Sequence, residues 1–92
     1  MKSEISVIIP IYNAEKFIIK CLDSVINQTF QDIEIICINN GAGHAETEIL
    51  ANASKNDKRI KIIRFEENQG YGKALNAGLE QACGEYIGIV ES

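Results

Sequence analysis

The feature that most constrains the fold of this chain is a short, almost wholly apolar run near its start, Ile5-Ser6-Val7-Ile8-Ile9. A strand without a polar face must be covered on both sides, which is typical of a central strand in a parallel sheet. We expect Pro10 to end this strand, because proline has no backbone N–H to give to the hydrogen-bond ladder. Asn13 then has the chemistry of a helix cap, and a helix is predicted from Ala14 to about Gln28.

The remainder of the chain alternates between apolar strands and amphipathic helices. Further strands are predicted at Ile33–Ile38, Ile60–Phe65 and Tyr86–Val90, and further helices at Ala45–Lys55 and Gly72–Ala82, with Gly84 as a left-handed stop. Charged residues alternate with apolar ones at 60–65, which predicts a half-exposed strand near the sheet edge. The order βαβαβαβ, joined by right-handed crossovers, predicts an α/β, Rossmann-like fold: a four-stranded parallel sheet in strand order 3-2-1-4, with helices on both faces. The 92 residues suffice for one small domain, which we place at residues 1–92.

The composition argues against several function classes. A net charge of −4, with scattered lysines and arginines, argues against non-specific nucleic-acid binding. No apolar run approaches the roughly 20 residues of a membrane-spanning helix, and the start does not have the form of a secretory signal. The cysteines, Cys21, Cys37 and Cys83, are odd in number and form no C-x-x-C pair, and the chain has one histidine. These counts argue against a zinc site, favour a reducing, cytoplasmic location and indicate that the cysteines are small core residues.

Two of the predicted loops suit a nucleobase. Both lie at the carboxyl ends of strands, where open α/β sheets bind their ligands. Tyr12, after the central strand, is placed to stack on a planar base, although packing on the following helix accounts for it equally well. The amide groups of Asn39 and Asn40 donate and accept at once, as the edge of a base requires, and Gly41 lets a ligand approach the backbone. A plain strand-to-helix turn also uses Asn and Gly, and composition alone favours that reading.

The other two loops at this edge carry a cation and a carboxylate. Gly70-Tyr71-Gly72-Lys73 combines glycines, a helix start and a lysine, which suits a phosphate group. Neither G-x-x-x-x-G-K-[ST] nor G-x-G-x-x-G is present, so the signal is weak. Glu91 follows the last strand and is a candidate ligand for Mn2+ or Mg2+. One carboxylate does not make a metal site, and Glu91 taken alone reads as a solvated chain end.

Five segments taken together are more specific than any single motif. They are SVIIPIYNAE at 6–15, CLDSVINQT at 21–29, DIEIICINNG at 32–41, NQGYGKALNAGL at 68–79 and GEYIGIVES at 84–92. In this order and spacing they resemble the N-terminal, nucleotide-binding half of the family 2 glycosyltransferases, which have the GT-A fold. The resemblance covers essentially the whole chain.

The resemblance implies roles for the residues at this edge. In the family, the P-x-Y-N loop and the end of the second strand hold the base and ribose. Those roles fall here on Pro10, Ile11, Tyr12, Asn13, Asn40 and Gly41, with Glu15 as a further candidate. Lys73 corresponds to a position close to the base or phosphates. The family's D-x-D motif carries the divalent cation, Mn2+ or Mg2+, and Glu91-Ser92 align with its first two positions.

The chain departs from the family pattern in two places. Asn40 stands where members usually have Asp, so the contact with the base loses a charge and the base preference is open. The sequence ends at Ser92, before the Asp expected next in the metal motif, and the acceptor-binding half and catalytic base would also follow. We therefore expect a truncated N-terminal part that binds little metal and transfers no sugar by itself.

The implied activity belongs to the full-length protein. It is transfer of a sugar from a nucleotide-diphosphate donor, a UDP-sugar, to a saccharide or lipid-linked acceptor in cell-surface polysaccharide synthesis, with peripheral membrane association of the full protein. A non-catalytic remnant that binds a nucleotide or a partner is the alternative. A receiver or dinucleotide-binding domain is a distant third alternative. A receiver needs an acidic cluster around a phospho-acceptor Asp, whereas the second predicted strand here ends in two asparagines. An open apolar edge at Tyr86–Val90 further predicts self-association of the chain.

Overall fold

The computed structural model describes residues 4–11, 20, 22–24, 27, 32–41 and 43–90. Its strands are β1 (Ile5–Ile11), β2 (Ile33–Asn40), β3 (Ile60–Phe65) and β4 (Tyr86–Ile89), and its helices are α2 (His44–Asn56) and α3 (Tyr71–Gln81). The helix predicted at 14–28 lies largely outside the described residues. Within that range, residues 20 and 22–24 are described and are helical.

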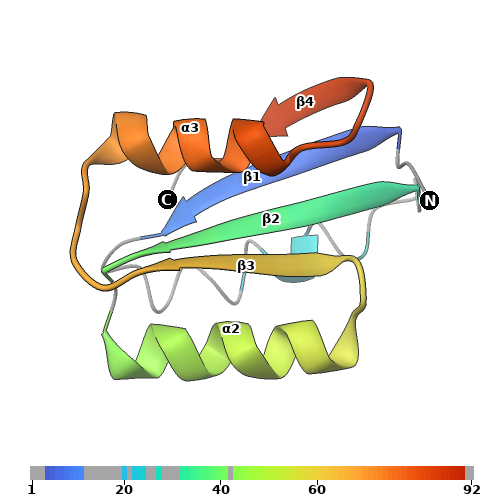
Figure 1. Cartoon of the computed structure of the whole chain (residues 1–92). Helices are drawn as coiled ribbons and strands as arrows, with labels where there is room; N and C mark the ends of the chain where they lie inside the picture. The colour runs from blue at the N-terminus through green and yellow to red at the C-terminus, as the bar shows by residue number, and fades with distance from the viewer. Residues whose placement is uncertain are drawn as a thin grey trace.

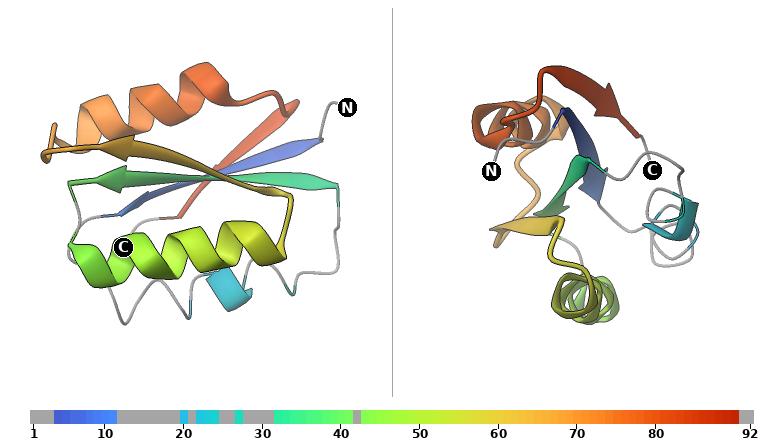
Figure 2. Two further views of the ribbon diagram at one scale, coloured as in Figure 1. Left: turned by 60° about the horizontal axis from the view of Figure 1, so that its bottom comes forward. Right: turned by 90° about the vertical axis from the view of Figure 1, so that its right-hand side faces the viewer.

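The four strands form one parallel sheet in the order β3-β2-β1-β4. The predicted strand order is confirmed, and so is the central position of β1, which the apolar run at 5–9 indicated. β3 lies at one edge, as its alternation of charged and apolar residues predicted. Figure 1 shows β1 and β2 in the middle of the sheet, with α3 above it and α2 below it. The right-hand view of Figure 2, which looks along the strands, shows the two helices on opposite faces of the sheet, as expected.

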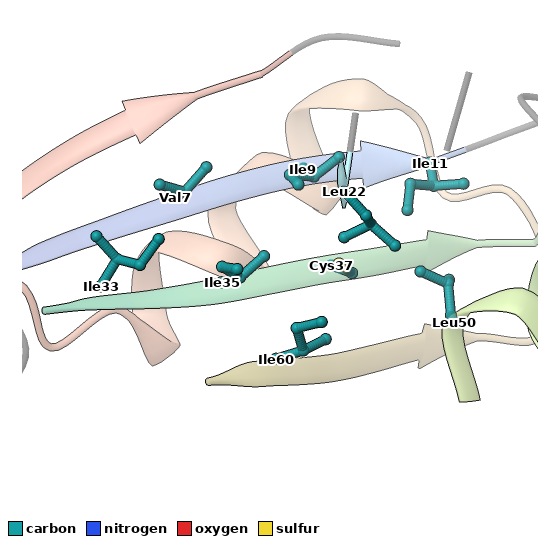
Figure 3. Close-up of a cluster of buried hydrophobic side chains, with 9 residues drawn as sticks. All are labelled: Val7, Ile9, Ile11, Leu22, Ile33, Ile35, Cys37, Leu50 and Ile60. Carbon is teal, nitrogen blue, oxygen red and sulfur yellow. The ribbon is translucent and has the colours of Figure 1, made fainter. Parts of the chain in front are cut away.

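The alternation of side chains along β1 and β2 builds a core on each face of the sheet. Odd-numbered residues such as Ile9 and Ile35 point to the face of the sheet on which α2 lies, where they form one cluster with Leu22 and Leu50. Figure 3 shows this larger cluster, to which β3 adds Ile60. Even-numbered residues such as Ile8 point to the other face, under α3. Both faces are apolar because both are covered, which explains why β1 and β2 read as nearly continuous apolar runs.

α3 lies close to the sheet because small residues form its inner face. Ala74 is fully buried, and Gly78 is buried over Ile8. A Cβ atom on Gly78 would lie 2.6 Å from Cγ2 of Ile8 and 3.0 Å from Cδ1 of Ile38. Leu79, on the same helix, is 41% exposed. α3 therefore faces the sheet with Ala74 and Gly78, and Leu79 is partly exposed to solvent.

Pro10 does not end β1, contrary to expectation. The strand continues through it and stays in register with β2. The carbonyl groups of Glu4 and Ile8 accept hydrogen bonds from the β4 segment, so the even-numbered residues of β1 turn their backbone groups toward β4. Pairing with β4 ends at Ile8 and Ile89. The last hydrogen bond to this side of β1 runs from the Val90 N–H to the Ile8 carbonyl oxygen. The nitrogen of Pro10 is the next group of β1 on the β4 side, so its missing N–H coincides with the end of that ladder and interrupts no bond to β2.

Gly84 is not a left-handed helix stop, because among the described glycines only Gly41 and Gly70 have positive φ. Its place in the fold depends on close approach instead. A Cβ on Gly84 would lie 2.5 Å from the backbone nitrogen of Ser6 and 2.7 Å from the carbonyl carbon of Ile5. The connection from α3 to β4 thus passes directly against the start of β1, where only glycine fits.

Candidate nucleotide site at the carboxyl edge of the sheet

The carboxyl ends of β1, β2 and β3 meet at the edge of the sheet where α2 and α3 begin, at the left in Figure 1. β2 reaches this edge two residues later than expected, since Asn39 and Asn40 remain in the ladder and pair with Arg64 and Phe65 of β3. The turn starts only at Gly41, with φ of 72°. Because both asparagine backbones are held by the sheet, their side chains are available to contact the neighbouring loops.

Asn40 links the end of β2 to the loop between β3 and α3. Its Oδ1 accepts a hydrogen bond from the backbone N–H of Gln69 at 2.8 Å, and its Nδ2 donates to the carbonyl oxygen of Gly70 at 3.3 Å. Asn40 is only 5% exposed. This contact joins residues 29 and 30 positions apart, and the sequence pattern alone did not reveal it.

Gly41 is required by the same loop. Its φ of 72° is a conformation that residues with side chains rarely adopt. A Cβ here would lie 2.3 Å from the backbone nitrogen of Asn68 and 2.6 Å from the carbonyl carbon of Glu67. The close approach that a glycine permits at this position is therefore taken by the protein's own loop.

Asn39 holds the start of α2 rather than the start of α3. Its Nδ2 donates to Oγ1 of Thr47 at 2.9 Å, and that hydroxyl in turn donates to the carbonyl oxygen of Gly43 at 2.9 Å. The backbone N–H of Thr47 bonds to the same carbonyl at 3.1 Å. Adjacent asparagines at the end of β2 thus contact the beginnings of both helices. Thr47 was missed in the sequence because it carries no turn or motif signal.

Lys73 lies exposed in the first turn of α3. Gly70, with φ of 89°, precedes this turn and offers no side chain as a cap. Its carbonyl oxygen accepts the backbone N–H of Ala74 at 3.2 Å, the first hydrogen bond of the helix. The same carbonyl is the one that Asn40 contacts, so the start of α3 is tied to the end of β2.

The structure brings five of the predicted site residues to this edge. They are Pro10 and Ile11 at the end of β1, Asn40 and Gly41 at the end of β2, and Lys73 at the start of α3. Ile11 is buried in the core on the α2 face. Tyr12, Asn13, Glu15 and the metal candidate Glu91 lie outside the described residues.

A second polar cluster, which sequence reasoning missed, lies at the opposite, amino edge of the sheet. The Glu34 carboxylate is buried in β2 and accepts hydrogen bonds from Ser6 Oγ at 2.5 Å and from Nζ of Lys61 at 2.7 Å. The backbone N–H of Cys83 donates to it at 2.5 Å, and that of Gly84 donates to Ser6 Oγ at 2.7 Å. This cluster secures the connection between α3 and β4.

The charge of Glu34 is stabilised by these donors. Burial raises its pKa, but the hydrogen bonds from Lys61, Ser6 and Cys83, with the Lys61 charge, outweigh burial and leave the pKa below its ordinary value. The hydrogen bond to Glu34 likewise raises the pKa of Lys61, against an opposing effect of burial. Cys37 is a buried core residue as expected, but Cys83 is exposed.

The described residues contain no group of three or more His, Cys, Asp or Glu side chains that could hold a metal ion. In the same part of the chain, no helix has the length and apolar character needed to cross a membrane.

The family model described as Glycosyl transferase family 2 matches residues 6–92. The chain belongs to this family. Among curated glycosyltransferases, it is 44% identical over 89 residues to GlyA of Streptococcus pneumoniae, and 44% identical over 87 residues to the uncharacterized EpsJ of Bacillus subtilis. These matches take in 97% and 95% of the chain but 13% and 25% of the relatives. The chain therefore spans a quarter or less of the length of these two glycosyltransferases.

Solved glycosyltransferase structures share the fold. Residues 1–349 of S. aureus TarS in complex with UDP have a TM-score of 0.87 and 33% identity, over 97% of this chain and 27% of that one. A mannosyltransferase from Pyrobaculum calidifontis, in complex with GDP-Man and Mn2+, has a TM-score of 0.87 at 21% identity, over 99% of this chain and 28% of that one. The fold is thus the GT-A type that the sequence resemblance implied.

Proposed function

We propose that residues 1–92 form the N-terminal part of a glycosyltransferase domain and bind the nucleotide of a nucleotide-diphosphate sugar. The observation that carries this proposal is the similarity to the UDP complex of TarS over nearly the whole chain. On this basis UDP is the preferred nucleotide. The site is the carboxyl edge of the sheet, where ligands of such folds bind.

The proposal assigns nucleotide contacts to two segments. The first segment is Pro10 and Ile11 at the end of β1 together with Tyr12, Asn13 and Glu15, which follow them in the sequence; the tyrosine ring can stack on the base. Lys73 supplies a positive charge at the start of α3, next to the helix N-terminus, where phosphate oxygens are stabilised. Asn40 and Gly41 belong to the site as the end of β2 between these segments.

The metal ion and the acceptor are proposed for the full-length protein. We propose that Glu91 is the first ligand of a divalent cation, Mn2+ or Mg2+, which would offset the charge of the diphosphate leaving group. The acceptor is a saccharide or lipid-linked saccharide in cell-surface polysaccharide synthesis, with the full protein in the cytoplasm and peripherally associated with the membrane. The Mn2+ complex of a protein with the same fold supports the cation.

The test is titration of the 15N-labelled chain with UDP, followed by NMR. We expect amide shifts at residues 11–13, at Asn40 and Gly41, and at Lys73; Pro10 has no amide N–H to observe. Lys73→Ala should weaken binding about three- to tenfold, as loss of one charge-assisted contact would. Lys58→Ala is the matched control, because Lys58 is also exposed but lies in the turn before β3, at the opposite edge of the sheet.

Shifts confined to the amino edge of the sheet, or equal effects of the two lysine variants, would contradict the proposed site. Parallel titration with GDP measures the base preference that Asn40 leaves open. Nucleotide binding by a longer gene product that transfers no sugar would favour the non-catalytic alternative.

A further inference from the structure

The start of α3 is held from outside the helix. Its N-cap position is Gly70, which has no side chain, and no side-chain cap is formed there. The carbonyl oxygen of Gly70 instead receives two donors, the Ala74 N–H of the helix itself and Nδ2 of Asn40 from β2. The neighbouring Gln69 N–H is accepted by Oδ1 of Asn40. One amide side chain therefore holds two peptide groups immediately before the helix, the one between Asn68 and Gln69 and the one between Gly70 and Tyr71.

Three further contacts hold the same loop in place. Asn68 Oδ1 accepts the backbone N–H of Gly70 at 2.7 Å, which tightens the turn. The Gly41 N–H donates to the carbonyl oxygen of Phe65 at 3.2 Å. The backbone of Asn68 occupies the space where Gly41 would carry a Cβ. The end of β2 and the loop before α3 thus form one tightly packed unit.

We propose that Asn40 is a positioning residue, which acts on the donor nucleotide through the Gln69–Gly70 loop and the Lys73-bearing first turn of α3. This inference rests on the proposed nucleotide site. Both polar atoms of the Asn40 side chain are already engaged by the loop, and the residue is 5% exposed. Lys73 follows Gly70 by three residues, so its backbone position depends on the peptide group that Asn40 holds.

An amide is the group this role requires. It presents one acceptor and one donor, and the loop offers a backbone N–H to the first and a carbonyl oxygen to the second. An ionised carboxylate would keep the bond to Gln69 but set a second oxygen against the Gly70 carbonyl. Asn40→Asp therefore distinguishes two roles. If Asn40 directly accepts the N–H of a base, the Asn40→Asp variant should bind UDP more tightly than the unsubstituted chain. If Asn40 holds the loop, the variant should bind UDP less tightly.

The experiment compares UDP affinity and amide hydrogen exchange in the unsubstituted chain, Asn40→Asp and Asn40→Ala. We expect UDP affinity at neutral pH to fall about three- to tenfold in Asn40→Asp, equivalent to one lost hydrogen bond. Lowering the pH toward protonation of the new carboxyl should restore part of the loss, because a protonated Asp again donates to Gly70. The ionisable groups on the segments that adjoin the end of β2 are present in all variants, so the difference between pH profiles reports the substitution; they are His44, Glu46, Arg64, Glu66, Glu67 and Lys73.

Two controls complete the test. Asn52→Asp makes the same chemical change at an exposed site in the middle of α2 and should leave UDP affinity unchanged. Lys73→Ala should reduce UDP affinity by a smaller factor in Asn40→Asp than in the unsubstituted chain, because the effects of coupled residues are not additive. Additive effects of the two substitutions would contradict action through α3.

Amide exchange tests the loop contact without any ligand. The Gln69 N–H should exchange several-fold faster in Asn40→Ala than in the unsubstituted chain. Equal exchange, or tighter UDP binding by Asn40→Asp, would overturn the positioning role. If the unsubstituted chain binds no UDP, the proposed function fails, and the nucleotide part of this inference fails with it. The exchange of Gln69 would still decide whether Asn40 holds the loop.

Discussion

Ser6 and Glu34 lie opposite each other in the β1–β2 register, and the Ser6 hydroxyl donates a hydrogen bond to the buried carboxylate at 2.5 Å. Lys61 and the Cys83 N–H complete the set of donors to Glu34. A buried carboxylate is stable only when such partners are present, because burial alone strongly disfavours the charge. The cluster therefore connects three strands and the α3–β4 loop, and its stabilising effect depends on the ionisation of Glu34.

Stability should consequently fall in acid. The pKa of Glu34 is lower in the folded chain, so its contribution is present above the ordinary carboxyl pKa of about 4.3 and is lost as the pH falls through the folded value. Asp57 adds the same trend, because the hydrogen bond from the Arg59 side chain, against the effect of burial, lowers its pKa too. Urea unfolding measured from neutral pH to about pH 3.5 should show this decline.

Replacement of Glu34 tests the same cluster directly. Glu34→Gln should destabilise the fold by about 1–3 kcal/mol at neutral pH, because an amide cannot accept from all three donors. Stability should also depend less on pH in this variant than in the unsubstituted chain. Ser6→Ala should destabilise by a similar amount, since it leaves the Gly84 N–H without its acceptor. Ser54→Ala, at a helix hydroxyl bonded only locally to the Ala51 carbonyl, is the matched control and should be nearly neutral.

Gly41 should tolerate no side chain. Gly41→Ala combines a left-handed φ with a Cβ placed 2.3 Å from the backbone of Asn68, so we expect a loss of about 2 kcal/mol or more. Gly43→Ala is the control, because its φ is −73° and its new Cβ would meet only a flexible Glu46 oxygen at 3.3 Å. Its cost should be about 0.5 kcal/mol, from a poorer helix cap. Thermal unfolding of the two variants measures the difference, and equal melting temperatures would contradict the close packing of the Gly41 turn.

Two glycines of α3 should respond in opposite directions. Gly78→Ala places a methyl group 2.6 Å from Ile8, and overpacking of this kind costs about 1–3 kcal/mol, more than the gain in helix propensity. Gly72→Ala meets no atom within 4 Å and should be stabilising by up to about 1 kcal/mol. Chemical denaturation of both variants decides the matter. If Gly78→Ala were as stable as Gly72→Ala, the helix would not lie as close to the sheet as described.

The sequence pattern predicted the elements and their order because these depend on local signals. The apolar run at 5–9 requires cover on both faces, and the charged residues of β3 indicate an edge. The end of β1 was predicted too early. The effect of Pro10 depends on where pairing with β4 ends, and that cannot be predicted from the residues around Pro10. Gly84 was recognised as special but for the wrong reason, since its close approach is to a strand far away in the sequence.

The sequence pattern did not predict side-chain contacts between residues that are far apart in the sequence. Glu34 reads as one polar residue in an apolar strand, and its donors lie on β1, on β3 and after α3. Asn40 was selected as a site residue for its amide group and its match to the family pattern, and it was expected in the loop after the second strand; in the structure it is the last residue of β2. Its contacts with Gln69 and Gly70 could not be read from the sequence, because asparagine before glycine is equally common in turns that bind nothing.

The edge strand β4 carries the last prediction, which is self-association of the chain. Ile87 and Ile89 are each 45% exposed and alternate along β4, so they share one face of the strand. Their register partners Ser6 and Ile8 lie on the α3 side of the sheet. Leu79 of α3 is 41% exposed on a helix that covers that side. Three large apolar side chains and an open strand edge favour pairing with a second copy.

Sedimentation velocity over a range of concentrations should therefore show reversible dimers or larger species. Ile87→Lys should shift the distribution toward monomer, since a lysine on an edge strand opposes edge-to-edge pairing. Asn52→Lys adds the same charge on the exposed surface of α2 and should leave association unchanged, which separates a local effect from a change in net charge. Circular dichroism should show that both variants remain folded. A chain that stays monomeric at high concentration and melts cooperatively at high temperature would show that β4 needs no further partner.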